Sequence, residues 1–194
     1  MSSLLMIILI LACIAASLLI LISEDWHWAM AGLGIQYLVA FLLVSQVWPI
    51  GLATIKLVAG WLACILLSMT AAPEIFEKDF YMTQSARYFR LFSAFFILVV
   101  MLAVTPVANV WLPIPYYHLL IGLLMTGMGI LQLGFSQSHF RIFLGLLTLL
   151  TGFEVIYASL EGSALLAALL AGITLALGLI GSAIFRRDQQ QGES

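Results

Sequence analysis

Long apolar segments follow one another along almost the entire chain, and this repetition limits the possible folds more than any other feature. Each segment contains about 20 residues, which is the length that a helix needs to cross the hydrocarbon core of a bilayer. In lipid, only helices and closed barrels satisfy all of their backbone polar groups. The segments are continuously apolar and do not alternate with a period of two, so they predict helices. We therefore expect an all-α, polytopic transmembrane helical bundle.

The composition excludes a water-soluble protein. Hydrophobic residues make up 64% of the 194 residues, and charged residues make up 8%. Soluble domains contain about 25% charged residues. The formal net charge of −2 offers no basic surface for nucleic acid. The lipid bilayer is therefore the expected surrounding, and nucleic acid is not an expected partner.

Charges, prolines and tryptophans divide the chain into about seven predicted spans, each long enough for a bilayer. The segment 73–90 carries many of the charges interleaved with apolar residues, which predicts one cytoplasmic interfacial amphipathic helix. Residues 1–194 are read as a single integral membrane domain, with four spans in 1–112 and three in 117–187. The predicted spans are 3–22, 29–47, 50–69, 91–111, 118–135, 140–160 and 163–185.

The positions of the basic residues predict the orientation, because Lys and Arg accumulate in short cytoplasmic loops. Seven spans with the N-terminus outside and the C-terminus in the cytoplasm place six of the seven basic residues on the inner face. The expected location is the inner (plasma) membrane of the cell, as a multi-pass protein. The six residues are Lys78, Arg87, Arg90, Arg141, Arg186 and Arg187.

Two charged residues, Lys56 and Glu154, fall well inside predicted spans. A charged side chain at the centre of a membrane helix costs about 2.5–3.5 kcal/mol on insertion scales, so such residues are candidates for function. Each lies six residues from the outer end of its span, which is a depth of about 9 Å at the helical rise of 1.5 Å per residue. We therefore expect Lys56 and Glu154 to share one level in the bundle interior.

Two interpretations of these residues stay open. They form a structural ion pair, or Lys56 extends its charge toward the interface. Alternatively, they relay protons or ions. Burial disfavours the charged forms of both groups, so it favours the loss of a proton by Lys56 and the uptake of a proton by Glu154.

No motif for catalysis, a cofactor or a metal ion is present in the sequence. Cys13 and Cys64 lie in apolar runs and are interpreted as packing residues, and the three histidines fall at predicted membrane boundaries and are interpreted as anchors. Small residues in the fifth and seventh spans predict close helix contacts. They are Gly122, Gly127, Gly129 and Gly134 in the fifth span and Ala168, Gly172 and Ala176 in the seventh. Polar residues that would line a hydrated path, or bridge helices, are Gln36, Thr54, Asn109, Gln132, Thr148, Thr151 and Thr174.

The three C-terminal spans carry several short motifs. Residues 118–122 read His-Leu-Leu-Ile-Gly and open a helix, residues 152–154 read Gly-Phe-Glu, and a helix rich in small residues ends at Arg186 and Arg187. With these features, residues 117–187 resemble the K-type (4L) membrane subunit of respiratory complex I and the C subunit of Mrp antiporters. The resemblance implies that Glu154 is a carboxylate of a proton-conducting axis.

The whole chain is similar to component E of hydrogenase-4, whose third span has a Thr and Lys stretch like Thr54 to Lys56. A second intramembrane carboxylate of the complex I subunits is missing here, because Ile173 and Thr174 occupy the corresponding region. The resemblance implies a non-catalytic subunit of a complex I-like, membrane hydrogenase-like or Mrp-like assembly. Such a subunit binds no cofactor, assembles with antiporter-like and quinone-module or hydrogenase membrane subunits, and contributes Glu154 and Lys56 to a proton or cation path.

Two other functions stay open at this point. The chain is an independent small transporter or channel, or it is a scaffold or assembly protein in which both buried charges are structural.

The predicted orientation is tested by thiol labelling of intact cells. A cysteine introduced at Gln190 is expected to resist an impermeant thiol reagent, because the C-terminus lies in the cytoplasm. A cysteine at Gly162, in a loop predicted to lie outside, is the control and is expected to react. Labelling of a cysteine at position 190 would show that the C-terminus lies outside and would contradict the predicted orientation.

Overall fold

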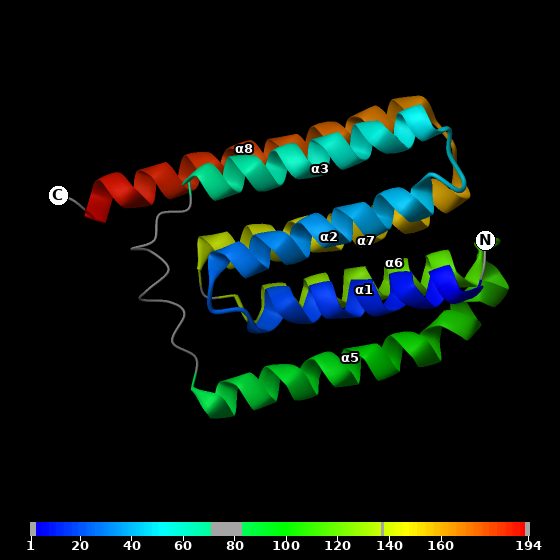
Figure 1. Ribbon diagram of the computed structural model, residues 1–194, viewed down its shortest axis with the longest axis horizontal. Helices are drawn as coiled ribbons and strands as arrows, with labels where there is room; N and C mark the ends of the chain where they lie inside the picture. The colour runs from blue at the N-terminus through cyan, green and yellow to red at the C-terminus, as the bar shows by residue number, and fades with distance from the viewer. Residues whose placement is uncertain (1–2, 71–82, 137, 193–194) are drawn as a thin grey trace.

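All regular structure in the part of the chain that is described, residues 3–70, 83–136 and 138–192 of a computed structural model, is α-helical. The helices are long, and apart from α3 and α5 consecutive helices are joined by short connections at either end of the bundle (Figure 1). In chain order they are α1 (Ser3–Ile22), α2 (Trp26–Val44), α3 (Ile50–Thr70), α5 (Gln84–Trp111), α6 (Tyr116–Gly134), α7 (His139–Leu160) and α8 (Ala164–Gly192).

Short polar side chains and prolines fix where several helices begin. Asp25 precedes α2, and its carboxylate accepts a hydrogen bond from the amide of His27 at 3.0 Å. Thr83 before α5 and Ser138 before α7 cap their helices in the same way. These side chains satisfy amide groups that have no partner inside the helix. Pro115 directly precedes α6, where its missing N–H and restricted backbone are compatible with a helix start.

The helices form two layers of three, with α5 along one edge (Figure 1). Helices α1, α2 and α3 pack in sequence as one layer, and α6, α7 and α8 form the other. Across the layers α1 contacts α6, α2 contacts α7 and α3 contacts α8, and the members of each pair run in the same direction. Helix α5 contacts α1 and α6. The fold is thus a pair of parallel three-helix units joined by one additional helix.

The two ends of the bundle are named here after a residue at each. The Trp48 end contains the connections 45–49, 112–115 and 161–163, and the Arg90 end contains 23–25 and the described residues between α6 and α7. Helix α1 begins at the Trp48 end and α8 ends at the Arg90 end (Figure 1). The first and the last helix therefore place the two ends of the chain at opposite ends of the bundle, as an odd number of spans requires.

Within the described residues, all seven helices are long and apolar enough to cross a membrane. Many large hydrophobic side chains point outward, and along α5 only Ala94 and Thr105 are buried. Water would not tolerate so large an apolar surface, whereas lipid covers it without cost. The chain is a multi-pass membrane protein, and the predicted all-α bundle of seven spans is confirmed.

The predicted interfacial helix over 73–90 lies mainly outside the described residues, which resume at position 83. From Gln84 onward the chain already belongs to α5, so this part of the prediction is wrong. Thr83 provides the cap, and no proline or glycine occurs between Thr83 and Thr105. Arg87 and Arg90 therefore lie on the first turns of a spanning helix.

Glycines allow the backbones of α6 and α7 to approach closely. A Cβ atom added at Gly152 would lie 2.5 Å from the amide nitrogen of Thr126 and 2.7 Å from the carbonyl oxygen of Gly122. One added at Gly129 would lie 2.6 Å from the amide nitrogen of Leu149. The close contacts predicted for the fifth span are confirmed at Gly122 and Gly129, because small residues let membrane helices pack backbone to backbone. The prediction is wrong for Gly134, where an added Cβ atom would meet nothing within 4 Å.

The close contact predicted for the small residues of the seventh span is wrong. Ala168, Gly172 and Ala176 lie on an exposed face of α8, and a Cβ atom at Gly172 would meet nothing within 4 Å. The close approach uses another face, where Gly178 packs against Ala63 of α3. Several faces of α8 carry small residues, and only tertiary packing selects one.

Replacement of Gly152 by alanine is expected to destabilise the protein by about 1–3 kcal/mol, because the added methyl group meets backbone atoms that cannot move independently. Gly172→Ala is the matched control and is expected to leave stability almost unchanged. Thermal unfolding of the purified variants in detergent measures the difference. Equal melting temperatures for the two variants would contradict the described packing of α6 on α7.

Candidate functional site

The two charged residues predicted inside the membrane meet in the bundle. The Lys56 ammonium on α3 lies 3.1 Å from a carboxylate oxygen, Oε2, of Glu154 on α7. The side chains are only 7% and 5% exposed. Helix α3 starts and α7 ends at the Trp48 end, so residues six positions from those ends reach the same level. The expectation of a shared interior level is confirmed.

Trp48 covers this ion pair from the end of the bundle. Its ring centroid lies 5.5 Å from the Lys56 ammonium nitrogen, which is within the range of a cation–π contact. Its indole N–H donates a hydrogen bond to the carbonyl oxygen of Glu161, at 3.1 Å. Trp48 therefore ties the α2–α3 connection to the end of α7 and closes the pair off on that side.

Several polar atoms at the pair have no hydrogen-bond partner among the described residues. They are Lys56 Nζ, whose approach to the carboxylate lacks hydrogen-bond geometry, Glu154 Oε1 and the Tyr37 hydroxyl. These three side chains line a cavity of about 10 Å³, together with Ala40, Phe41, Val44 and Leu57. A cavity that contains one water centre needs about 10–15 Å³ and polar partners, so this space matches one water molecule. The pair has a polar pocket beside it rather than a closed apolar wall.

A second polar cluster lies deeper in the bundle. The Gln36 amide on α2 donates to the Ser17 hydroxyl of α1 at 2.9 Å and accepts from the Thr148 hydroxyl of α7 at 3.0 Å. All three side chains are almost completely buried. The cluster therefore joins three helices through side chains alone.

Helix α7 carries both groups on one interior face. Thr148, Thr151 and Glu154 follow one another at intervals of three residues, which places them on one side of a helix. All three are buried. Thr174 of α8 lies beside Glu154, and the Thr151 hydroxyl lies near that of Tyr37. Polar side chains thus extend from the ion pair toward the middle of the membrane.

Other candidates from the sequence lie elsewhere. Thr54 is exposed, and its hydroxyl donates to the carbonyl of Ile50 in its own helix. Asn109 lies on α5, which packs against α1 and α6, whereas the ion pair joins α3 and α7. His118 was predicted to be an interfacial anchor, but it is 4% exposed and its Nε2 lies 3.1 Å from the carbonyl oxygen of Leu43. That part of the interpretation is wrong, because the packing of α6 on the interior buries the start of α6.

Three residues of the site were missed by sequence reasoning: Ser17, Tyr37 and Trp48. The sequence does carry a signal for Ser17 and Tyr37, because both are polar residues inside apolar segments, as Gln36 is. Trp48 is a tryptophan at the end of a predicted span, and nothing in the neighbouring sequence indicates that its ring covers Lys56.

Within the residues that are described, no group of three or more His, Cys, Asp or Glu side chains is arranged to bind a metal ion. No protein-family model, curated protein or solved structure matches the chain. The fold and the site define a class: a multi-pass membrane protein, with seven spanning helices among its described residues and a buried intramembrane ion pair.

Replacement of Gln36 by leucine is expected to lower stability by about 1 kcal/mol, because both Ser17 and Thr148 lose a buried partner. Gln46→Leu is the control, since the Gln46 side chain is exposed and donates to the backbone carbonyl of Leu42, on its own helix. Thermal unfolding in detergent compares them. A Gln36 variant as stable as the control would show that the cluster contributes no stability.

Proposed function

We propose that this chain is a non-catalytic integral subunit of a complex I-like, membrane hydrogenase-like or Mrp-like assembly. In this proposal Lys56 and Glu154 form part of a proton or cation path, in the inner (plasma) membrane, with the N-terminus outside. One observation carries the proposal: two opposite charges are buried together in the membrane beside unsatisfied polar atoms and a water-sized cavity. Membrane proteins retain such charges mainly where ions or protons pass.

The geometry supports a relay in the following way. A proton that reaches the cavity binds the unpartnered oxygen of Glu154 and removes its negative charge. The Lys56 ammonium then lacks a counter-charge in a medium of low dielectric constant, which strongly favours its loss of a proton or its movement toward another anion. A partner subunit that alters the hydration of this pocket would therefore drive the proton from Lys56 to the next acceptor.

The polar residues of the interior provide a route away from the pair. Thr151 and the cluster of Ser17, Gln36 and Thr148 lie on the side toward the Arg90 end. Hydroxyl and amide groups hydrogen-bond water, and such groups line hydrated paths in membrane proteins. The remaining support is the sequence resemblance, in which Glu154 matches a relay carboxylate.

A second function, that of a scaffold or assembly protein, is favoured by the direct contact between Lys56 and Glu154. A buried ion pair covered by Trp48 also serves to fix α3 against α7. The two functions differ in what happens when Glu154 loses its ability to ionise.

Replacement of Glu154 by glutamine separates the two functions. A relay predicts that the assembled complex persists but loses proton or cation translocation, because the amide keeps the volume and cannot titrate. A structural pair predicts failed assembly, since breaking a buried pair leaves an unpaired charge that costs about 3–5 kcal/mol. Blue-native electrophoresis reports assembly, and dye-based pumping by inverted membrane vesicles reports translocation.

The double variant Lys56→Met with Glu154→Gln completes the experiment. Restored assembly together with restored pumping would establish the structural function, and restored assembly without pumping would support the relay. Glu161→Gln is the matched control, because Glu161 is an exposed carboxylate beyond the end of α7. An assembled Glu154→Gln complex that pumps at the wild-type rate would refute the relay. Recovery of the wild-type chain from mild detergent as a stable monomer would refute the subunit assignment.

A further inference from the structure

Tyr37 is the third polar side chain of the cavity beside the ion pair, and its hydroxyl group has no role in the contacts described so far. The residue lies on α2, which packs against both α3 with Lys56 and α7 with Glu154. It is only 3% exposed, and its hydroxyl has no hydrogen-bond partner among the described residues. A buried hydroxyl without a hydrogen bond is costly, so this group indicates a ligand in the cavity.

The packing of α2 on α3 fixes the Tyr37 ring in place. A Cβ atom added at Gly60 would lie 2.3 Å from Cδ1 of the ring and 2.5 Å from Cε1. Gly60 follows Lys56 by four residues, so the two positions share one face of α3. The ring therefore lies directly on the backbone of the helix that carries the ammonium group. This contact holds the hydroxyl at one position beside the ion pair.

The cavity of about 10 Å³ offers a single water molecule three hydrogen-bond partners. Lys56 Nζ can only donate, and the carboxylate oxygen Oε1 of Glu154 can only accept. A water between them accepts from the ammonium, donates one hydrogen to Oε1 and needs an acceptor for its second hydrogen. The Tyr37 oxygen is that acceptor, because the other described side chains that line the cavity are apolar. They are Ala40, Phe41, Val44 and Leu57.

The neighbouring Thr151 hydroxyl leaves this acceptor available. It lies near the Tyr37 hydroxyl but donates its hydrogen to the carbonyl oxygen of Leu147, at 2.7 Å. A threonine hydroxyl has only one hydrogen to donate. The lone pairs of the Tyr37 oxygen therefore remain for a ligand in the cavity.

We propose that Tyr37 is a positioning residue of the ion path, whose hydroxyl aligns a water molecule that transfers protons to Glu154. This inference rests on the proposed function of the ion pair. Proton transfer through one water requires the water to be within hydrogen-bond reach of the group that receives the proton. The contact between Lys56 and Glu154 lacks hydrogen-bond geometry itself, so the water provides the aligned connection.

The transfer is balanced within the cavity. The water makes three hydrogen bonds, so one of its lone pairs stays free for a proton that arrives along the path. One O–H bond forms at the water, another O–H bond of the same water breaks, and a new O–H bond forms at Oε1 of Glu154. Glu154 becomes neutral, the water is restored, and Tyr37 keeps its own proton.

Tyr37→Phe tests the inference in the assembled complex. The loss of one hydrogen bond to the water is expected to lower pumping by inverted membrane vesicles about tenfold. Phenylalanine keeps the ring on Gly60, so assembly and melting temperature are expected to stay close to those of the wild type. The ratio of pumping rates in ordinary and heavy water is expected to rise, because proton transfer at the water becomes limiting. A purely structural role of the hydroxyl would not change that ratio.

Tyr157→Phe is the matched control, because the Tyr157 hydroxyl donates to the Glu161 carboxylate, and both residues lie outside the cavity lining. This variant is expected to pump like the wild type, and an equal loss of pumping in it would overturn the inference. A Tyr37→Phe complex would also overturn it by pumping at the wild-type rate, by losing pumping with an unchanged isotope ratio, or by failing to assemble.

Glu154→Gln, measured alongside, distinguishes failure of this inference from failure of the proposed function. An inactive Glu154→Gln complex beside a fully active Tyr37→Phe complex would reject the role of Tyr37 and retain the ion path. A Glu154→Gln complex that pumps at the wild-type rate would reject the ion path itself, and the role of Tyr37 with it.

Discussion

A charge in hydrocarbon must find its counter-charge inside the protein, and the arrangement of the bundle around Lys56 and Glu154 depends on this requirement. The ammonium and the carboxylate come from different layers, on α3 and α7, so the pair holds across the interface between the two three-helix units. Trp48 extends that connection by bonding the end of α7. The same low dielectric that makes an unpaired charge costly makes any change in protonation here consequential for the whole bundle.

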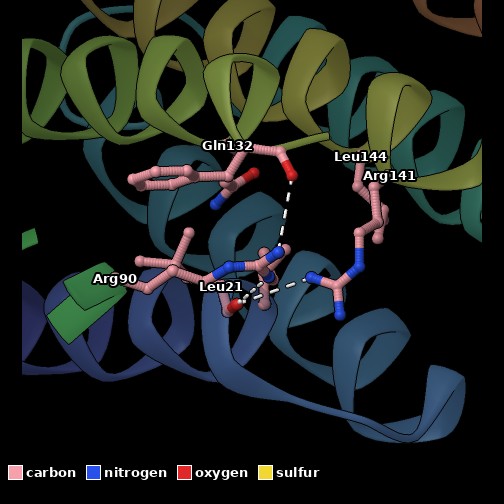
Figure 2. Close-up of a pocket in the computed structure, with 7 residues that line it drawn as sticks. Leu21, Arg90, Gln132, Arg141 and Leu144 are labelled. Atoms are coloured by element: carbon pink, nitrogen blue, oxygen red, sulfur yellow. Dashed lines mark hydrogen bonds between the residues drawn. The ribbon is translucent and has the colours of Figure 1, made fainter. Parts of the chain in front are cut away.

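The polar interior differs from one end of the bundle to the other. Near the Trp48 end Lys56 and Glu154 form a buried ion pair, whereas at the Arg90 end the guanidinium groups of Arg90 and Arg141 donate to the carbonyl oxygen of Leu21 (Figure 2). Between them, the cluster around Gln36 joins α1, α2 and α7 through hydrogen bonds.

Much of the architecture could be predicted from the sequence, because span length and apolar character reflect the solvent directly. The seven spans appear within a few residues of their predicted positions, except that α5 starts earlier. The equal depth of Lys56 and Glu154 followed from counting residues to the ends of their spans, and their meeting bears out that reasoning. Errors arose where a residue's role depends on its neighbours. His118 is buried rather than interfacial, and the small residues around Gly172 face outward.

By itself, the sequence determined that this chain forms seven apolar helices and that two charges lie at the same level within them, since both properties depend on local composition and helical rise. Only the tertiary structure decided which helices pair, which face of each helix turns inward, and which side chains surround the charges. Helix faces in a membrane are apolar all round, so hydrophobicity does not distinguish interior from exterior there. The contacts of Tyr37 and Trp48 depend instead on shape and on close packing at glycines such as Gly152, which no local pattern encodes.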